Sequence, residues 1–340
     1  MKVIHWNVSK RIHPVFGAKR YEDELFENIK KLREDLEIER IQRVDSKIIG
    51  SVPLSWLLRY RCRDADIVHA TYQTIAPVAY FRKPKRFIVT VHDLAPLLYP
   101  SVIKDISTRI QWVFTLRALK KADRIIAISE FTKKEIARLC GVTQDKIAIV
   151  YLGVDHSKYH PMDKEVCKRK LDLSVEEKHI LVVASNLKHK RMDLTKKVFD
   201  KIRQQRKDIK MIKGGYGESL EGQGIISPGW VPESQMPALF NAADVYLHTS
   251  EYEGFGLPIL EAMACGVPVV VSNKASIPEV VGDLGDIVDL DSEDCVEQFV
   301  EKILENIDKG RDEKALERSK KFSWEKTAKE TLKVYKEVMK

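Results

Sequence analysis

The sequence predicts two α/β domains, each built on a doubly wound parallel sheet. Short apolar runs rich in β-branched residues alternate with helical patterns from one end of the chain to the other. This alternation is typical of parallel strands whose two faces are both covered by helices. The pattern occurs twice, and 340 residues suit two domains of ordinary size.

The first domain is expected over residues 1–160. Its strand patterns cover residues 3–7, 38–44, 67–70, 87–91, 124–128 and 147–150. Helical patterns lie between them at 20–33, 106–121 and 130–139. The run 103–119 carries apolar residues on a broad arc, including Trp112 and Phe114. A packed core helix and a helix lying on a membrane are both open readings of that arc.

The second domain is expected over residues 161–322, after a break rich in glycine, proline and polar residues from Gly153 to Pro161. Its strand patterns are 180–184, 209–212, 244–248, 268–271 and 286–288, and its helical patterns are 192–206, 233–240, 257–265 and 295–307. No strand follows the last helix, so residues 323–340 are expected to cross back to the first domain. Such sheets bind ligands beyond the carboxyl ends of their strands, and two such domains favour a site in a cleft between them.

Composition excludes several classes of protein. The longest apolar runs, such as 87–91, are strand-sized and far below the roughly 20 residues of a membrane span. The first residues run directly into a strand pattern and lack the apolar segment of a signal peptide. The five cysteines are scattered without a Cys-x-x-Cys spacing. These features predict a reduced cytoplasmic protein without structural zinc.

Positive charge is concentrated in the first half. Residues 1–160 hold 29 Lys and Arg against 18 Asp and Glu, a net +11, whereas residues 161–340 have a net −3. This is either ordinary surface charge or a surface for an anionic partner, such as lipid headgroups or a phosphorylated acceptor. A peripheral position on the inner face of the membrane is therefore open. Nucleic acid is not expected, because no recognised binding motif accompanies the charge.

The segment 244–271 carries the strongest functional signal. A buried strand pattern ends in the loop Glu253-Gly254-Phe255-Gly256, which leads directly into a helix with Pro258 in its first turn. Glycines let the backbone approach a ligand closely, and a helix N-terminus favours an anion such as a diphosphate. Glu261 lies about one turn into the helix and can reach sugar or ribose hydroxyls.

The run E-G-F-G-L-P-x-L-E-A-M-A-C-G-x-P-V-V closely resembles the family-4 glycosyltransferases, whose E-x7-E motif it contains. The similarity extends along nearly the whole chain, through residues 89–94, 127–131, 150–155, 229–232 and 277–281. It implies a GT-B architecture, with two Rossmann-like domains facing across a cleft. It also implies a retaining hexosyltransferase that uses a UDP- or GDP-sugar and needs no metal or other cofactor.

The resemblance carries catalytic roles to three residues. Glu253 would contact hydroxyls of the donor sugar, Lys190 would bind the phosphates, and His92 would face the donor sugar from the first domain. A cation at Lys190 would offset the charge that develops on the departing diphosphate.

Further donor contacts are implied in the second domain. Glu261 would bind the ribose hydroxyls, and the loop 229–232, with Val231, would hold the base through its backbone. The amides expected around the sugar and phosphate belong to Gly254, Phe255, Gly256 and Leu257.

Two departures from the family pattern matter. The family usually has a glycine and often an arginine before the lysine, where this chain has residues 184–187, Ala-Ser-Asn-Leu. Arg191 or Asn186 is the candidate replacement for the second phosphate contact. The family often has a glycine pair near the acceptor, where this chain has Gly17-Ala18, so Gly17 is the acceptor-side candidate.

Other readings are still open. Two Asp-x-Asp pairs, 64–66 and 289–291, lack evident partner ligands for a metal, and the glycine cluster 214–217 lacks a full G-x-G-x-x-G motif. The acceptor can be a glycan, a lipid-linked sugar or a small molecule. Another nucleotide-sugar enzyme such as an epimerase, or a non-catalytic nucleotide-sugar-binding protein, is the alternative function.

Overall fold

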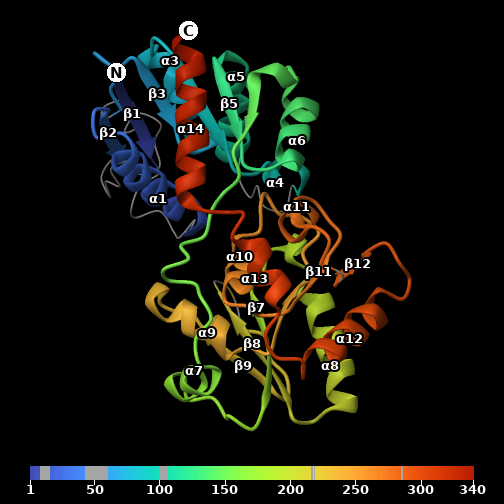
Figure 1. Ribbon diagram of the computed structural model, residues 1–340. Coiled ribbons are helices and arrows are strands. Elements are labelled where there is room, and N and C mark those ends of the chain that lie inside the picture. The colour runs from blue at the N-terminus through green and yellow to red at the C-terminus, as the bar shows by residue number, and fades with distance from the viewer. Residues whose placement is uncertain (8–15, 43–59, 100–105, 216, 218, 285) are drawn as a thin grey trace, which may run out of the picture. The chain divides into compact units, whose positions relative to one another are not determined.

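The chain forms two compact units, residues 1–153 with 324–340 and residues 154–323. The structure is a computed structural model that describes residues 1–7, 16–42, 60–99, 106–215, 217, 219–284 and 286–340 (Figure 1). Each unit contains one six-stranded sheet in which every strand pairing is parallel. The prediction of two doubly wound α/β domains is confirmed.

The sheet of the first unit has the strand order β2-β1-β3-β4-β5-β6. The strands are β1 (Lys2–Asn7), β2 (Glu37–Gln42), β3 (Ile67–Ala70), β4 (Phe87–Val91), β5 (Arg124–Ala127) and β6 (Ile147–Ile149). Every residue of β3 and β4 is buried, as expected of central strands that are covered on both faces. The edge strand β2 is mostly half-buried.

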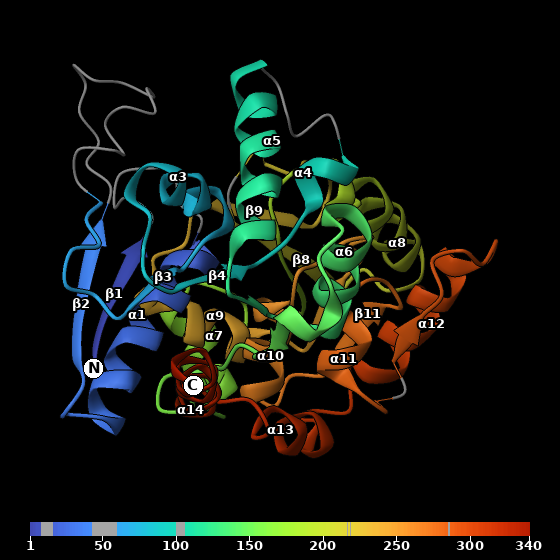
Figure 2. The same ribbon diagram turned by 90° about the horizontal axis from the view of Figure 1, so that it is seen from above.

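Helices cover both faces of this sheet. They are α1 (Phe16–Leu32), α3 (Ala79–Arg82), α4 (Ala95–Leu98), α5 (Ile106–Lys121), α6 (Glu130–Cys140) and α14 (Trp324–Met339), with 3₁₀ helices η1 (Gln73–Val78) and η3 (Gln144–Lys146). Figure 2 shows α1 and α14 on one side of the sheet and α5 on the other. Trp112 of α5 and Ile136 of α6 belong to the same core cluster as Val89 and Val91 of β4.

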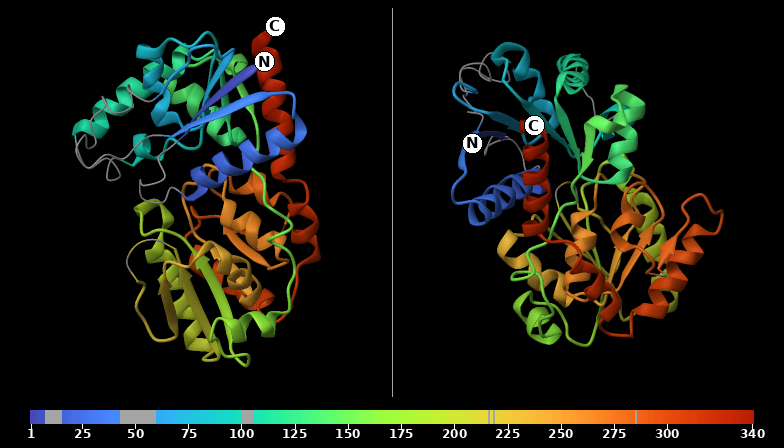
Figure 3. Two further views of the ribbon diagram at one scale, coloured as in Figure 1. Left: turned by 90° about the vertical axis from the view of Figure 1, so that its left-hand side faces the viewer. Right: turned by 45° about the horizontal axis from the view of Figure 1, so that its top comes forward.

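The C-terminal helix α14 is part of the first unit, where it packs beside α1 (Figure 3). A buried polar cluster fixes it there. The Tyr335 hydroxyl lies 2.8 Å from Nε2 of His5 and 2.7 Å from Nδ1 of His69, so one side chain of α14 bridges β1 and β3. Burial lowers the pKa of His5 to about 3 and raises the pKa of Tyr335, so both the ring and its hydroxyl partner stay neutral.

The sheet of the second unit has the order β12-β11-β10-β7-β8-β9. Its strands are β7 (Lys178–Val183), β8 (Ile209–Gly214), β9 (Ile225–Gly229), β10 (Val245–His248), β11 (Val269–Ser272) and β12 (Ile287–Val288). The chain runs outward from β7 to β9 and then returns to β10 on the other side of β7. The strand order therefore reverses between β7 and β10, and loops at such a reversal are the usual ligand site of an open α/β sheet.

Helices cover both faces of the second sheet as well. They are α7 (Lys164–Lys170), α8 (Met192–Gln205), α9 (Met236–Ala242), α10 (Leu257–Ala264), α11 (Ile277–Val281), α12 (Cys295–Asn306) and α13 (Glu313–Ser319), with 3₁₀ helices η4 (Lys188–Lys190) and η5 (Glu233–Gln235). Phe199 of α8 and Phe299 of α12 share one core cluster with Val245 and Leu247 of β10.

The observed elements differ from the predicted ones in a few places. The predicted helix 233–240 begins as η5 and restarts as α9, because Pro237 lies in the first turn of α9 and has no N–H to donate. Residues 43–44 of one predicted strand, residues 103–105 of the apolar run 103–119 and Tyr216 of the glycine cluster lie outside the described residues. Within the described ranges, no helix is both long and apolar enough to span a bilayer.

Candidate functional site

The reversal of strand order in the second unit brings together two loops that the sequence analysis singled out. The loop after β7 carries Lys190, and the loop after β10 carries Glu253. The two residues are 63 positions apart in the sequence, yet Lys190 Nζ donates to Glu253 Oε1 at 2.6 Å. The predicted lysine and the first glutamate of the E-x7-E motif therefore form one ion pair at the mouth of the sheet.

A histidine that the sequence analysis did not select completes this cluster. His248, the last residue of β10, donates from Nε2 to the same Oε1 atom of Glu253 at 2.7 Å. Its other ring nitrogen, Nδ1, lies 3.2 Å from the hydroxyl of Tyr246, and the two rings stack. One carboxylate oxygen thus accepts from two donors, Lys190 on the loop after β7 and His248 at the end of β10.

The cluster keeps Glu253 ionised. Burial by itself would raise the pKa of Glu253, but the Lys190 ammonium and the hydrogen bonds from His248 and Lys190 lower it well below its usual range. Both partners are largely shielded, with side-chain exposures of 17 % for Lys190 and 13 % for Glu253. Their charges are therefore weakly screened by water and available to a ligand at the same place.

Hydroxyl groups from neighbouring elements fix the Glu253 loop. Ser276, at the start of α11, donates to the carbonyl oxygens of Glu253 and Phe255 at 2.9 and 3.0 Å. Ser272, at the end of β11, donates to Ser250 O at 2.6 Å. The carbonyl groups of this bent loop cannot all pair with a neighbouring strand, and the two serine hydroxyls satisfy them instead. Residues of other elements therefore fix the conformation of the loop.

The two loops are also joined directly to each other. The Glu251 amide donates to His189 O at 2.8 Å, and Thr249 Oγ1 lies 3.2 Å from Lys190 O. Thr195, in the first turn of α8, shares a 2.7 Å hydrogen bond with the Thr249 hydroxyl. The backbone that carries Lys190 is thus held against the backbone that carries Glu253.

Helix α10 begins where the glycine loop ends. Gly256 precedes its first residue with φ +106°, a conformation that favours glycine, and an added Cβ would lie 3.1 Å from Ile259 Cδ1. Among the described residues, no side chain caps this helix end. Pro258 has no N–H, and the Ile259 and Leu260 amides donate to Gly256 O at 3.0 and 3.2 Å, so the amides left for an anion at the start of α10 are those of Gly256 and Leu257. Phe255 is buried, Gly254 and Leu257 are half-buried, and Glu261 is buried in the second turn.

The remaining predicted donor residues lie around the same loops. Arg191, which has φ +52° at the start of α8, pairs with Glu251 and with Asp193. Asn186 is exposed between β7 and η4, and an added Cβ at Gly217 would lie 2.9 Å from its Oδ1 atom. Val231 is half-buried after the edge strand β9.

In the first unit, His92 directly follows β4. It is buried between the rings of Tyr21 and Tyr72, with ring centroids 4.9 and 5.3 Å away. Burial lowers the pKa of His92 to about 4, although the bond to the Thr71 carbonyl oxygen, 3.0 Å from Nε2, opposes that shift. Because a carbonyl only accepts, Nε2 carries the proton, and Nδ1 of the neutral ring is left as an acceptor.

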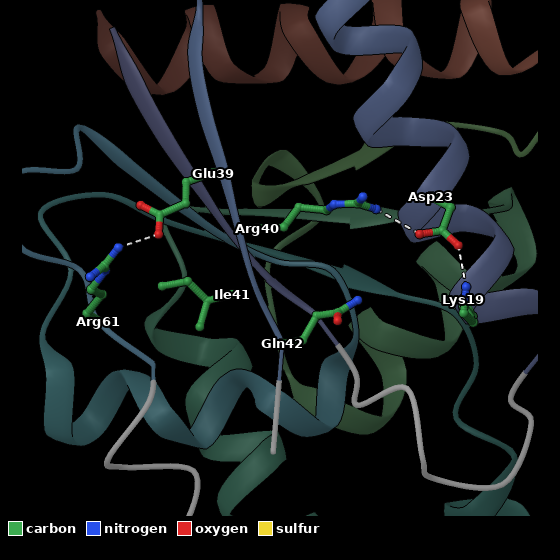
Figure 4. A pocket seen from close by; sticks show the side chains of 7 residues that line it. All are labelled: Lys19, Asp23, Glu39, Arg40, Ile41, Gln42 and Arg61. Carbon is green, nitrogen blue, oxygen red and sulfur yellow. Dashed lines mark hydrogen bonds and ion pairs between the residues drawn. The ribbon is translucent and has the colours of Figure 1, made fainter. Parts of the chain in front are cut away.

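The acceptor-side candidate Gly17 lies in the first turn of α1. Two residues further along, Lys19 lines a pocket of about 610 Å³ at the β2 edge of this unit (Figure 4). Its charged side chains are paired, with Arg40 2.7 Å and Lys19 2.5 Å from Asp23. Glu39, Arg61, Ile41 and Gln42 complete the lining. The pocket therefore presents carboxylate and guanidinium hydrogen-bonding groups whose charges largely cancel.

The two Asp-x-Asp pairs make local protein contacts. Asp66 accepts from the Lys2 amide at 2.9 Å, which closes the start of β1 onto the start of β3. Asp289 accepts from Asn273 at 2.7 Å, and Asp291 pairs with Lys274. Within the described part of the chain, no group of three or more His, Cys, Asp or Glu side chains is placed to hold a metal ion.

Two family models together span almost the whole sequence. Residues 15–158 match the model described as Glycosyltransferase Family 4, and residues 163–323 match the model described as Glycosyl transferases group 1. The two matches divide the chain close to the boundary between its two structural units.

Individual relatives give the same result. The chain is 31 % identical over 271 residues to O-antigen chain mannosyltransferase B of Escherichia coli. The aligned region covers 74 % of this chain and 70 % of that protein. It is 26 % identical to the serotype-specific mannosyltransferase WbdA of Escherichia coli over 72 % of this chain, but over only 32 % of that longer protein.

Solved structures share the fold at lower identity. Anabaena Alr3699/HepE in complex with UDP and glucose superposes with a TM-score of 0.75 at 17 % identity, over 99 % of this chain and 100 % of that one. WaaG, a glycosyltransferase involved in lipopolysaccharide biosynthesis, superposes with a TM-score of 0.63 at 11 % identity, over 97 % and 94 %. The sequence similarity of this chain to these families and relatives, together with its two Rossmann-like units, shows that the chain belongs to the family-4 glycosyltransferases of the GT-B fold.

Proposed function

We propose that the protein is a retaining mannosyltransferase that moves mannose from a nucleoside diphosphate to a hydroxyl group of a glycan acceptor. The observation that carries this proposal is the Lys190–Glu253 pair beside the uncapped start of α10. In this arrangement a cation and helix amides can bind the diphosphate, and a carboxylate beside them can accept from sugar hydroxyls. The choice of mannose rests on the relatives, since the two Escherichia coli proteins are named mannosyltransferases.

Donor binding redistributes the contacts of this cluster. The Lys190 ammonium already touches Glu253, and a diphosphate placed at the start of α10 competes for it with two negative charges. Lys190 then turns to the phosphates, together with the first amides of α10, and stabilises the charge that develops as the C1–O bond breaks. Glu253 keeps its bond from His248 and accepts from the sugar hydroxyls.

Transfer then proceeds on one face of the sugar. The bond between C1 and the diphosphate breaks with its electron pair on the phosphate oxygen, and the acceptor oxygen bonds to C1 from the same side. The proton of the acceptor hydroxyl passes to the leaving phosphate oxygen, so the step needs no protein nucleophile. The acceptor is a hydroxyl-rich molecule, and the polar pocket at Lys19 and Arg40 offers it paired carboxylate and guanidinium groups.

A transfer assay tests the proposal. The purified protein is incubated with mannose donors carrying guanosine or uridine diphosphate, with a glycan acceptor panel, and with excess chelator in a parallel series. We expect an α-linked mannosyl product that retains the donor configuration, at a rate within about twofold with chelator, because Lys190 and the α10 amides supply the charge stabilisation.

Three outcomes would contradict this proposal in different ways. Loss of transfer in chelator that Mg²⁺ or Mn²⁺ restores would show that a metal is required. A free epimerised sugar formed without an acceptor would favour an epimerase. Donor binding without turnover across the acceptor panel would favour a nucleotide-sugar-binding protein.

His248 is expected to position Glu253 during turnover. In His248→Phe the ring is kept but the bond to Glu253 is lost, and loss of a hydrogen bond to a charged group corresponds to about 1.5 kcal/mol, or roughly tenfold. We expect kcat to fall by about that factor, with donor affinity little changed. His248→Gln returns an N–H near the same position and should recover most of the rate. Equal rates in all three proteins would contradict the positioning role.

A further inference from the structure

Helix α5 has apolar residues on two opposite sides. Trp112, Ala118 and Leu119 on its inner side are buried in the core cluster of the first unit. On its outer side Ile106, Ile110, Val113 and Phe114 are between 46 % and 75 % exposed. Their spacing of four, seven and eight residues places them in one stripe along the helix. A helix that is apolar on both sides normally has a partner on each of them.

The same outer side is cationic. Between Ile106 and Lys121 the helix contains no Asp or Glu, but it contains Arg109, Arg117, Lys120 and Lys121. Arg117 and Lys121 continue the stripe of exposed apolar side chains at the helical spacing, so apolar and cationic groups share one surface. Cations at the end of a helix also complement its dipole, but that effect does not explain the exposed apolar side chains beside them.

The neighbouring helix α3 extends this surface. Lys121 lies over the ring of Tyr80, 4.3 Å from its centroid, so a side chain of α5 contacts a side chain of α3. Figure 2 shows the two helices beside each other. Phe81 of α3 is 66 % exposed, and it is followed by the exposed cations Lys83 and Lys85. We call the α5 surface the set formed by one side chain of α3, the two lysines that follow α3 and the exposed side chains of α5. It comprises Phe81, Lys83, Lys85, Ile106, Arg109, Ile110, Val113, Phe114, Arg117, Lys120 and Lys121.

We propose that the α5 surface docks on an anionic lipid surface. Apolar side chains enter the boundary between headgroups and acyl chains, while Lys and Arg beside them bind lipid phosphates. A second copy of the chain is a poorer partner, because a symmetric contact would place the cations of one α5 against those of the other. The excess of positive charge in residues 1–160 attracts the same anionic surface over a longer range.

This inference does not depend on the transferase reaction. Binding to vesicles needs neither donor nor acceptor, so its failure and the failure of the proposed function are separate results. If both hold, docking places the enzyme at a surface where lipid-linked acceptors are concentrated.

Vesicle co-sedimentation of the full chain tests it. Vesicles are made of phosphatidylcholine alone, or of phosphatidylcholine with one third phosphatidylglycerol. The wild-type protein should bind the second kind at least tenfold more tightly than the first, and added salt should weaken that binding. Ile110→Ser with Phe114→Ser, and separately Arg117→Glu with Lys120→Glu, should each weaken it at least tenfold.

Matched controls make the test specific to the α5 surface. Val166→Ser removes an equally exposed apolar side chain from α7, and Lys133→Glu with Lys134→Glu reverses two charges on α6. Both controls should bind like the wild type, and thermal unfolding should show all variants folded. Unchanged binding by the two α5 variants would overturn the proposal. A dimer in solution that Ile110→Ser with Phe114→Ser abolishes would overturn it too, since the face would then belong to a second copy.

Discussion

Replacing Glu253 with glutamine should lower kcat about 10²–10³-fold, the range measured when one well-placed polar contact is removed from an active site. Glutamine preserves the shape of the side chain but removes the charge that holds Lys190 and His248. It also places an amide where the proposed mechanism needs an acceptor for sugar hydroxyls. Steady-state rates with the mannose donor, together with thermal unfolding, measure the change.

The control for this variant is Glu297→Gln. Glu297 makes an exposed ion pair with Lys201 on the α8 and α12 side of the second unit. Exposed pairs contribute about 0–1 kcal/mol to stability, so this substitution should leave both rate and fold nearly unchanged. If the Glu253 variant were folded and retained a near-normal rate, the assignment of the E-x7-E glutamate would be wrong.

Replacing Lys190 with methionine should also lower kcat about 10²–10³-fold, through loss of charge stabilisation on the leaving diphosphate. Methionine keeps the apolar length of the side chain, so packing is largely preserved. The variant has a second consequence, because Glu253 is then buried beside His248 without its cation. Since the Lys190 charge is the main effect that lowers the pKa of Glu253, that pKa should rise in the variant.

Two comparisons separate these effects. Lys196→Met, in the second turn of α8, removes an exposed pair with Asp200 and should behave like the wild type. The double variant of Lys190 and Glu253 should lose less than the product of the two single losses, because the two residues act as one unit. Strictly multiplicative losses would mean that the two residues act independently, so that the ion pair between them contributes nothing to catalysis.

Much of the fold could be predicted because its signals are local. The buried strands 67–70 and 87–91 are short apolar runs, and their observed bounds equal the predicted ones. The edge strand β9 was missed, since it contains Pro228 and ends at Gly229, residues that normally argue against a strand. An edge strand tolerates them because one of its sides makes no sheet contact.

The site was only partly predictable, because it depends on how the loops meet. The glycine loop and Glu253 have a strong local pattern, but their partner Lys190 lies on another loop. His248 is the last residue of a buried strand, and nothing in the sequence separates it from an ordinary core position. Its role follows only from the bend that returns Glu253 to it five residues later.

The outer side of α5 illustrates the same limit. The sequence shows apolar residues on a broad arc, which predicts a helix with much apolar surface. Which part of that arc is covered depends on the neighbouring helices and strands. The structure shows Trp112 covered and Ile110 exposed, so the core-helix reading holds for the inner side, and membrane contact of the outer side stays a proposal.

In the proposed reaction, Lys190 and the start of α10 receive the diphosphate of the donor. The most direct test is a crystal structure of the protein with a nucleoside diphosphate bound. We expect phosphate oxygens within hydrogen-bonding distance of Lys190 Nζ and of the amides at the start of α10, with Glu253 still held by His248. A nucleotide bound elsewhere, with Lys190 still paired to Glu253, would contradict it.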